Sequence, residues 1–194
     1  MKYYQEITLL PAYDVPVNFI WSKVYPQIHL AFVSYQNKKG IMPFGVSLPE
    51  YGADYKKKIM LGNKLRIFST NEDALAELDV SKWLSRLEDY VHLTGVRPVP
   101  AHVKGYSIYG RYHQEGSIAQ KARRFSKRHS ISYEESEKLF PKKWKACMLP
   151  YVQLQSMTNH NMFRLFIGKK SMSQPVQGEF GSYGLSNQAT VPEF

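Results

Sequence analysis

The sequence has one cysteine and no long apolar run. Cys147 is alone among 194 residues, which excludes an intramolecular disulfide and a metal cluster built on cysteines. No segment reaches the ~18 apolar residues of a membrane span, and the first residues, MKYYQEITLLPAY, lack the apolar centre of a secretory signal. A basic composition without disulfides is typical of the cytoplasm. We therefore expect a cytoplasmic protein without a membrane anchor.

Motifs for nucleotide cofactors and catalytic metals are also missing. The chain contains neither GxxxxGK[ST] nor GxGxxG, the glycine-rich loops that hold cofactor phosphates. HExxH is absent, the six histidines are scattered, and no cluster of Asp and Glu resembles a two-metal nuclease site. We expect no cofactor and no metal ligands. If the chain cuts a phosphodiester, acid–base chemistry on RNA fits best, because RNA carries its own 2′-hydroxyl nucleophile.

Acidic residues are scarce relative to basic ones. The 26 Lys and Arg exceed the 16 Asp and Glu, which gives a formal net charge of +10. The excess is local, because residues 97–145 hold twelve Lys or Arg against four Glu, a net charge of +8. A hydrophobic fraction of 43% indicates a folded protein with a core. The second half is therefore the expected surface for a polyanion such as nucleic acid.

The strongest local pattern is SIAQKARRFSKRH, residues 117–129, which predicts a basic amphipathic helix. Ser117 and Gln120 suit a capping box at its start. Three apolar residues form a stripe that can dock on a core: Ile118, Ala122 and Phe125. The rest of the helix surface carries five cations: Lys121, Arg123, Arg124, Lys127 and Arg128. Such a helix is usually a solvated face. Because it contains no Asp or Glu, we favour contact with RNA or DNA phosphates.

The first half of the chain has the element order β-α-β-β-α-β. Strands are predicted at 3–10, 43–48, 64–69 and 90–96. One helix is predicted at 17–36, with a kink or a break near Pro26, and another from an Asn71 cap through 78, extended or restarted at 81–87. This order is that of a ferredoxin-like unit. We expect an α+β protein: a ferredoxin-like domain at 1–97, then a smaller C-terminal α/β domain at 98–194 that carries the basic helix.

The second half shows a less regular pattern. A strand is predicted at 103–112, and a short helix follows a capping box at Ser132 and Glu135. Residues 151–156 and 162–167 are typical of the two strands of a hairpin. Glycines at 178, 181 and 184 indicate tight turns and close approach of the backbone.

One histidine has a position that suits catalysis. His29 lies at the border of the apolar side of the helix predicted at 17–36, where a rigid backbone can present a side chain in a cleft. Its ordinary pKa of ~6.5 suits proton transfer near neutral pH. The other interpretation is a partly buried histidine that a neighbour satisfies, and nothing local in the sequence decides between the two.

Several segments together resemble a known family, the type I-F CRISPR repeat-processing endoribonucleases, which cut precursor CRISPR RNA beside a repeat hairpin. The resemblance spans nearly the whole chain. It covers ITLLP, QIHLAF, FGVSLPEYG, and GRYHQ followed by the basic helix. The most specific segments are MFRLFIG and the terminal FGSYGLSNQATVPEF.

The resemblance implies roles for individual residues. The catalytic histidine of the family falls on His29, the catalytic serine on Ser156, and the tyrosine that helps to position the histidine on Tyr183. The resemblance also implies contacts with RNA. Phe163 would stack on a nucleotide, Arg111 would read a guanine, and His113 would make a contact at a position where the family has glutamine. The basic helix would bind the groove, with Lys127 in place of an arginine.

The family also implies a reaction and partners. The 2′-hydroxyl would attack in line without a metal, leaving a 2′,3′-cyclic phosphate and a 5′-hydroxyl. The protein would stay on the repeat hairpin of the guide RNA, with the other protein subunits of a type I-F surveillance complex. Two alternatives remain open: a non-catalytic hairpin-binding subunit of a ribonucleoprotein, and a ribosomal-type RNA-binding protein, which leaves FGSYGLS unexplained.

Overall fold

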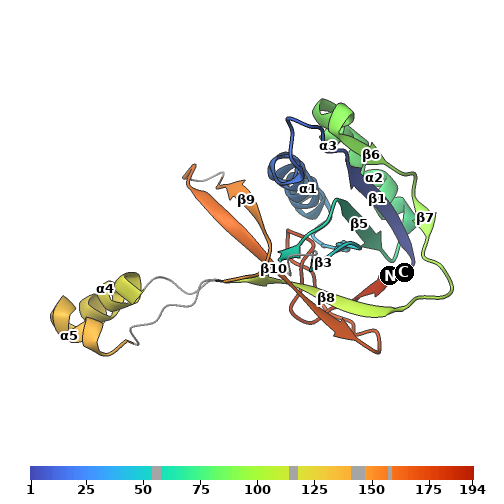
Figure 1. Ribbon diagram of the computed structural model, residues 1–194. Helices are drawn as coiled ribbons and strands as arrows, with labels where there is room; N and C mark the ends of the chain where they lie inside the picture. Colours follow the sequence, from blue (N-terminus) through green and yellow to red (C-terminus); the bar gives the residue numbers. More distant parts are fainter. Residues whose placement is uncertain (54–57, 114–117, 141–146, 157–158) are drawn as a thin grey trace. The chain divides into compact units, whose positions relative to one another are not determined.

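The computed structural model describes residues 1–53, 58–113, 118–140, 147–156 and 159–194 (Figure 1). The protein has a mixed α/β structure, and its strands pair in antiparallel fashion. Two compact units make up the chain. The first combines Met1–Tyr112 with Leu149–Phe194, and the second is the intervening segment His113–Met148.

The first sheet is built from the N-terminal half. Its strands β2 (Gly45–Ser47), β5 (Lys64–Ser69), β1 (Tyr3–Leu9) and β6 (Val91–Leu93) lie in that order, and β7 (Arg97–Pro98) pairs with the start of β1. Along β1, Gln5, Ile7 and Leu9 are buried while their neighbours are partly exposed. This period of two places one face of the strand in the core. The strands predicted at 3–10 and 64–69 are confirmed.

Helix α1 (Val17–Lys39) runs without a break through Pro26. Of the kink or break predicted near Pro26, the break is therefore wrong. Pro26 lies off the buried stripe, and Tyr25, Ile28 and Phe32 anchor both halves of the helix in one core. That burial offsets the hydrogen bond that proline cannot donate. The helix ends at Gly40, whose left-handed conformation (φ +72°) lets its N–H donate to the Gln36 carbonyl.

The second sheet joins both parts of the first unit. Strands β11 (Val191–Glu193), β8 (Gly105–Tyr112), β10 (Met162–Met172) and β9 (Tyr151–Gln155) lie in that order, and the hairpin of β9 and β10 is confirmed. A short separate hairpin pairs β3 (Gly52–Ala53) with β4 (Ile59–Met60). The structure does not divide between residues 97 and 98, because buried residues of the second sheet share one core with the N-terminal half: Tyr109, Val152, Leu154, Leu165, Ile167 and Val191.

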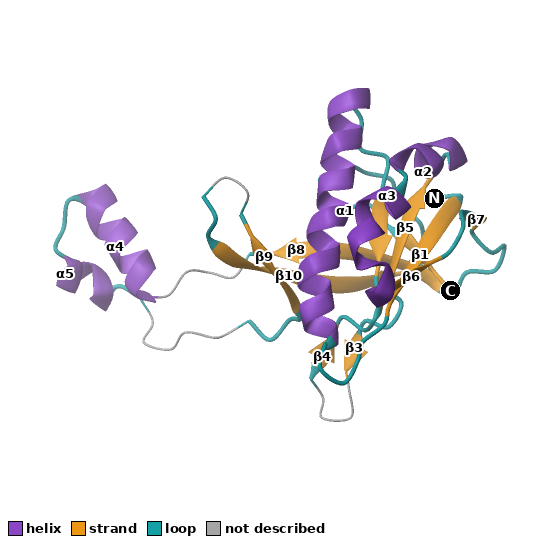
Figure 2. Cartoon of the chain, turned by 90° about the horizontal axis from the view of Figure 1, so that it is seen from above, coloured by secondary structure: helices purple, strands orange, loops and turns teal. Residues whose placement is uncertain are grey.

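Short helices follow β5. Helix α2 (Glu72–Leu78) begins after the predicted cap, where the Asn71 side chain accepts a hydrogen bond from the Asp73 N–H. Helix α3 (Val80–Leu84) and the 3₁₀ helix η1 (Ser85–Tyr90) take the place of the helix predicted at 81–87. Helix η1 is itself kinked, since Leu87 within it has non-helical dihedral angles. Helix α3 lies beside α1 (Figure 2).

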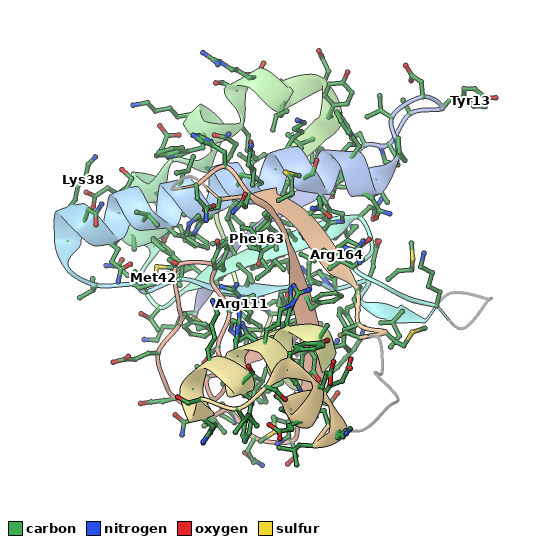
Figure 3. The ribbon with its side chains drawn as sticks, turned by 90° about the vertical axis from the view of Figure 1, so that its left-hand side faces the viewer. Tyr13, Lys38, Met42, Arg111, Phe163 and Arg164 are labelled. Atoms are coloured by element: carbon green, nitrogen blue, oxygen red, sulfur yellow. The ribbon has the colours of Figure 1, made fainter. Side chains whose placement is uncertain are left out.

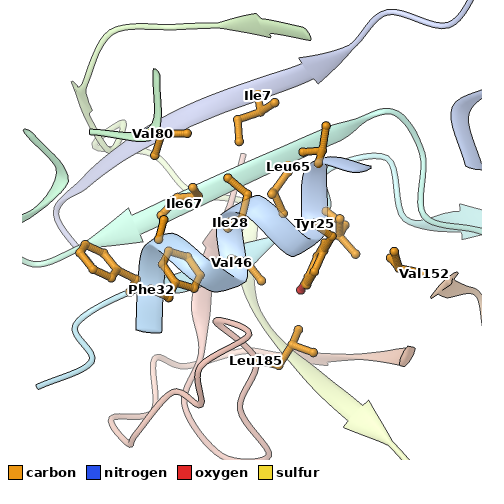
Figure 4. Packing of buried hydrophobic residues seen from close by; sticks show 14 of the residues in the cluster. Ile7, Tyr25, Ile28, Phe32, Val46, Leu65, Ile67, Val80, Val152 and Leu185 are labelled. Carbon is orange, nitrogen blue, oxygen red and sulfur yellow. The ribbon is translucent and has the colours of Figure 1, made fainter. Parts of the chain in front are cut away.

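The core of the first unit lies around α1. Figure 4 shows Tyr25, Ile28 and Phe32 of α1 among side chains of the first sheet and of the C-terminal segment. Phe32 and Phe44 stack with 5.2 Å between their ring centroids. This packing fixes the axis and rotation of α1, and therefore the direction of every other side chain on that helix.

The second unit contains α4 (Ile118–His129) and α5 (Tyr133–Lys138). The capping box of Ser132 and Glu135 is confirmed, whereas Ser117 lies outside the described residues. The buried Ser136 hydroxyl donates to the Ala122 carbonyl over 2.7 Å and so joins the two helices. Of the helices in the described ranges, none has the length and apolar character that crossing a membrane requires.

Candidate functional site: an oriented histidine in an aromatic stack

His29 is held through one ring nitrogen, and no residue in the described ranges forms a hydrogen bond with the other. It lies on α1 with a partly exposed side chain. Its Nδ1 lies 2.8 Å from the carbonyl oxygen of Ser182, 153 residues later in the chain. A carbonyl oxygen only accepts hydrogen bonds, so Nδ1 carries the proton and donates it. In the neutral ring, Nε2 then carries the lone pair that a general base uses.

The imidazole of His29 lies flat on an aromatic ring. The rings of His29 and Tyr183 stack with 4.1 Å between centroids and 9° between planes. Tyr25, fully buried and one turn earlier on α1, donates from its hydroxyl to the Tyr183 carbonyl over 3.1 Å. Two side chains of one rigid helix therefore hold the backbone at 182–183, and that segment in turn fixes the plane of the imidazole.

The segment that meets α1 is a tight turn, residues 181–184. The Gly184 N–H donates to the Gly181 carbonyl over 2.7 Å, and the Gly184 carbonyl accepts from the Val46 N–H on β2 over 3.0 Å. Gly184 has a φ of +69°, in the left-handed region that L side chains rarely adopt. The tight turn predicted from the glycines of the tail is confirmed here.

We expect Gly184→Ala to lower the free energy of unfolding by about 2–4 kcal/mol, measured by denaturant titration. A Cβ at this position would lie 2.5 Å from Val46 Cγ1 and 2.9 Å from Phe32 Cε2, and the backbone conformation would be strained. Gly181→Ala is the matched control, because its Cβ would meet only the Leu185 carbonyl, at 3.6 Å. Equal stability of the two variants would contradict this interpretation of the turn.

A guanidinium group joins the aromatic stack from the second sheet. The Arg111 Cζ lies 5.7 Å from the ring centroid of Tyr183 and 5.8 Å from that of Phe163. Arg111 is on β8 opposite Ile167 of β10, the strand that also carries Phe163, and Figure 3 shows Arg111 and Phe163 close together. Cation–π contacts of this kind orient the guanidinium and concentrate positive charge beside the stack.

The tyrosines of the stack are not bases at neutral pH. Burial raises the pKa of Tyr183 above its ordinary value, and the nearby Arg111 cation opposes that shift. Full burial raises the pKa of Tyr25 as well. Both phenols therefore stay protonated at neutral pH and can act as hydrogen-bond donors, not as bases. Over the described ranges, no three His, Cys, Asp or Glu side chains form a group that could hold a metal ion.

Ser156 follows β9 at the turn of the hairpin and is partly exposed. Its N–H donates to the Asn161 carbonyl over 2.9 Å, and its carbonyl accepts from the His160 N–H over 2.9 Å. These bonds fix the backbone at Ser156. Strand β9 packs beside α1, the helix that carries His29. Direct contact between the side chains of Ser156 and His29 stays a prediction.

The cations of the basic helix lie on α4 in the second unit. Arg123, Arg124, Lys127 and Arg128 are exposed, and Lys121 is partly exposed. Ala122 is fully buried, and the ring of Phe125 contacts Phe140 edge-on, with 5.8 Å between centroids. Ala122 and Phe125 thus pack within the unit, and the four exposed cations face outward. His113, which precedes this unit's helices, is also exposed.

The sequence analysis missed two contributors to the site. These are the carbonyl oxygen of Ser182, which selects the tautomer of His29, and Tyr25, which holds the Tyr183 carbonyl. The glycines on either side of Ser182 and Tyr183 were a usable signal, because a tight turn presents consecutive carbonyls to a neighbouring element. Tyr25 gave no separate signal, since it matches the apolar pattern of α1.

Comparisons with known proteins identify the family. A family model described as CRISPR-associated protein (Cas_Csy4) matches residues 4–194. The chain is thus a CRISPR-associated protein. It belongs to the Cas_Csy4 family.

Relatives are similar over their full length. A protein of Escherichia coli (strain UTI89 / UPEC), named CRISPR-associated endonuclease Cas6/Csy4, is 30% identical over 196 residues, which cover 100% of both chains. A protein of the same name from Pseudomonas aeruginosa (strain UCBPP-PA14) is 31% identical, also over 100% of both chains. A solved structure titled as an RAMP protein binding different RNA substrates covers 97% of this chain and 99% of its own, at 14% identity and a TM-score of 0.34.

Proposed function

We propose that this protein is an endoribonuclease that cuts precursor CRISPR RNA at the 3′ base of the repeat hairpin. The observation that carries the proposal is the geometry of His29, whose Nδ1 is fixed by a carbonyl and whose Nε2 is left for proton transfer. Membership of the Cas_Csy4 family and full-length similarity to two proteins named as CRISPR-associated endonucleases support the same conclusion.

The reaction is a transesterification within the RNA. The 2′-oxygen upstream of the cut forms a bond to phosphorus, and the bond from phosphorus to the 5′-oxygen breaks. The 2′-hydroxyl loses its proton and the leaving oxygen gains one, and His29 acts on one of these protons through Nε2. The products are a 2′,3′-cyclic phosphate and a 5′-hydroxyl. Because RNA supplies the nucleophile, the step needs no metal ion or other cofactor.

Neighbouring residues orient the RNA and the histidine. Tyr183 keeps the imidazole plane fixed by stacking, and Ser156 positions the attacking 2′-hydroxyl. Phe163 stacks on a nucleotide beside the cut, and Arg111 reads a guanine at the base of the stem. His113, which follows β8, adds a contact to the same closing pairs.

The second unit holds the hairpin. We infer that α4 lies along the major groove near the end of the stem and contacts phosphates through its five cations: Lys121, Arg123, Arg124, Lys127 and Arg128. In the first unit, the strand order β2-β5-β1-β6 with all pairs antiparallel supports a ferredoxin-like arrangement that carries His29. The protein stays on the hairpin after cutting, as a subunit of a type I-F surveillance complex in the cytoplasm.

Cleavage of a labelled repeat RNA in EDTA tests this function. We expect one cut at the 3′ base of the hairpin, with a cyclic phosphate on the upstream fragment, and no cut in an RNA whose stem is scrambled. Chelation should leave the rate unchanged. Tight hairpin binding without any cut would identify the protein as a non-catalytic subunit, and cutting that needs added metal would overturn the proposed chemistry.

A further inference from the structure

A basic cavity lies between α1 and the segment formed by α3 and η1. Its volume is about 410 Å³, within the range of small-ligand sites. Lys23 and Gln27 line it from α1, and Lys82, Trp83 and Arg86 line it from the other side. Every residue that lines it is in the first unit.

The polar groups of this cavity are suited to an anion. Lys23, Lys82 and Arg86 are exposed cations, and no Asp or Glu is among the lining residues, although Glu88 and Asp89 follow closely in the chain. Within the described part of the chain, the ion pairs of lysine and arginine involve other residues than these three. Their charge is therefore available to a ligand, since no carboxylate in the described ranges forms an ion pair with them.

Two aromatic side chains lie next to these cations. Trp83 is half-buried in the wall of the cavity, with its ring packed against the core. Phe19 of α1, 52% exposed, contacts the lining residue Lys23, whose Nζ is 5.2 Å from the Phe19 ring centroid. Cations that follow a backbone and aromatic faces that stack on bases are the two elements of a single-strand nucleic-acid site. An acidic peptide would use the cations and leave the rings without a role.

The cavity and His29 lie on two flanks of the same helix. Gln27 precedes His29 by two residues, which corresponds to about 200° of rotation and about 3 Å along the axis. An α-helix with its side chains is about 10–12 Å across, so a strand of a few nucleotides can pass over α1 from one flank to the other.

We propose that this cavity binds the single-stranded RNA that continues 3′ of the cut. The inference rests on the proposed function, because cleavage at the 3′ base of the hairpin makes that strand the one that leaves the site of His29. Lys82 and Arg86 contact its phosphates, and Trp83 stacks on one of its bases. The cavity thus adds affinity for uncut precursor and loses its ligand once the downstream product dissociates.

Binding of two uncleavable RNAs tests the proposal. Both carry a 2′-deoxy nucleotide before the cut; one ends at the cut and one extends about six nucleotides beyond it. We expect wild type to bind the extended RNA about tenfold more tightly. The double variant Lys82→Ser and Arg86→Ser should abolish that gain. Its slope of log affinity against log salt concentration should be lower by roughly 1.4, because two phosphate contacts are lost. Lys38→Ser, at the far end of α1, is the control (Figure 3).

Each other outcome has a defined meaning. Equal binding of the two RNAs by wild type overturns the proposal, and so does a gain that survives the double substitution. If the extension adds nothing and a polyglutamate peptide binds through Lys82 and Arg86, the ligand is an acidic protein segment. If the protein binds neither RNA, the proposed function itself is overturned. If it cleaves unmodified repeat RNA but the extension does not change binding, only this inference is overturned.

Discussion

His29→Ala should lower the rate of repeat cleavage by about 10²–10⁴-fold and leave hairpin affinity nearly unchanged. The substitution removes Nε2, the nitrogen that the Ser182 contact leaves for proton transfer. The phosphate contacts proposed for α4 belong to the other unit of the chain, so we expect them not to depend on this ring. Single-turnover cleavage with saturating protein separates the chemical step from binding, and a filter-binding titration measures affinity.

Two further variants make this result specific. His29→Asn can keep a side-chain N–H near the Ser182 carbonyl but has no equivalent of Nε2, so it should be as slow as alanine. His92→Ala, an exposed histidine on β6, should cut like wild type. Cleavage at the wild-type rate by both His29 variants would show that another residue moves the proton.

Replacing Arg124, Lys127 and Arg128 together with alanine should weaken hairpin binding by roughly a hundredfold to a thousandfold. These side chains are exposed at helical spacing on α4, and we expect about 1–1.5 kcal/mol from each charged contact. Since each phosphate contact releases counterions, the slope of log affinity against log salt should also fall by roughly 2–3. The measurement is a series of binding titrations at increasing salt concentration.

Lys138→Ala is the matched control for α4, because Lys138 is an exposed lysine of the same unit on α5. It should change neither the affinity nor the salt slope appreciably. At saturating protein, the triple variant should cut at nearly the wild-type rate, since the group that moves the proton is intact. An unchanged salt slope would mean that α4 is a solvated face and that other residues hold the hairpin.

Local sequence signals predicted the elements of this protein well. Asn71 and Ser132 mark helix starts because their side chains accept hydrogen bonds from N–H groups only two or three residues away. Of the kink or break predicted near Pro26, the break was wrong because the outcome depends on contacts with distant residues. Burial of α1 on both sides of the proline is a tertiary effect, which a local rule does not include.

Contacts between residues far apart in the sequence could not be predicted from local patterns. No local pattern shows that Val191 pairs with Ser107, yet this pairing joins the C-terminal strand β11 to β8 in the second sheet. The candidate site depends on the same kind of contact, because the carbonyl that orients His29 comes from Ser182. The resemblance to a family implied that Tyr183 helps to position His29; the two rings stack in the structure, and the role itself stays a prediction. The identity of the orienting atom required the folded chain.

The most direct test of the proposed chemistry is cleavage of a repeat RNA that lacks one oxygen, the 2′-hydroxyl of the nucleotide just upstream of the cut. Under single-turnover conditions in EDTA, the proposal predicts full binding of this RNA and no cleavage, beside complete cleavage of the unmodified RNA. Cleavage of the 2′-deoxy RNA at the same phosphate would contradict it, because the nucleophile would then have to be water or a group of the protein.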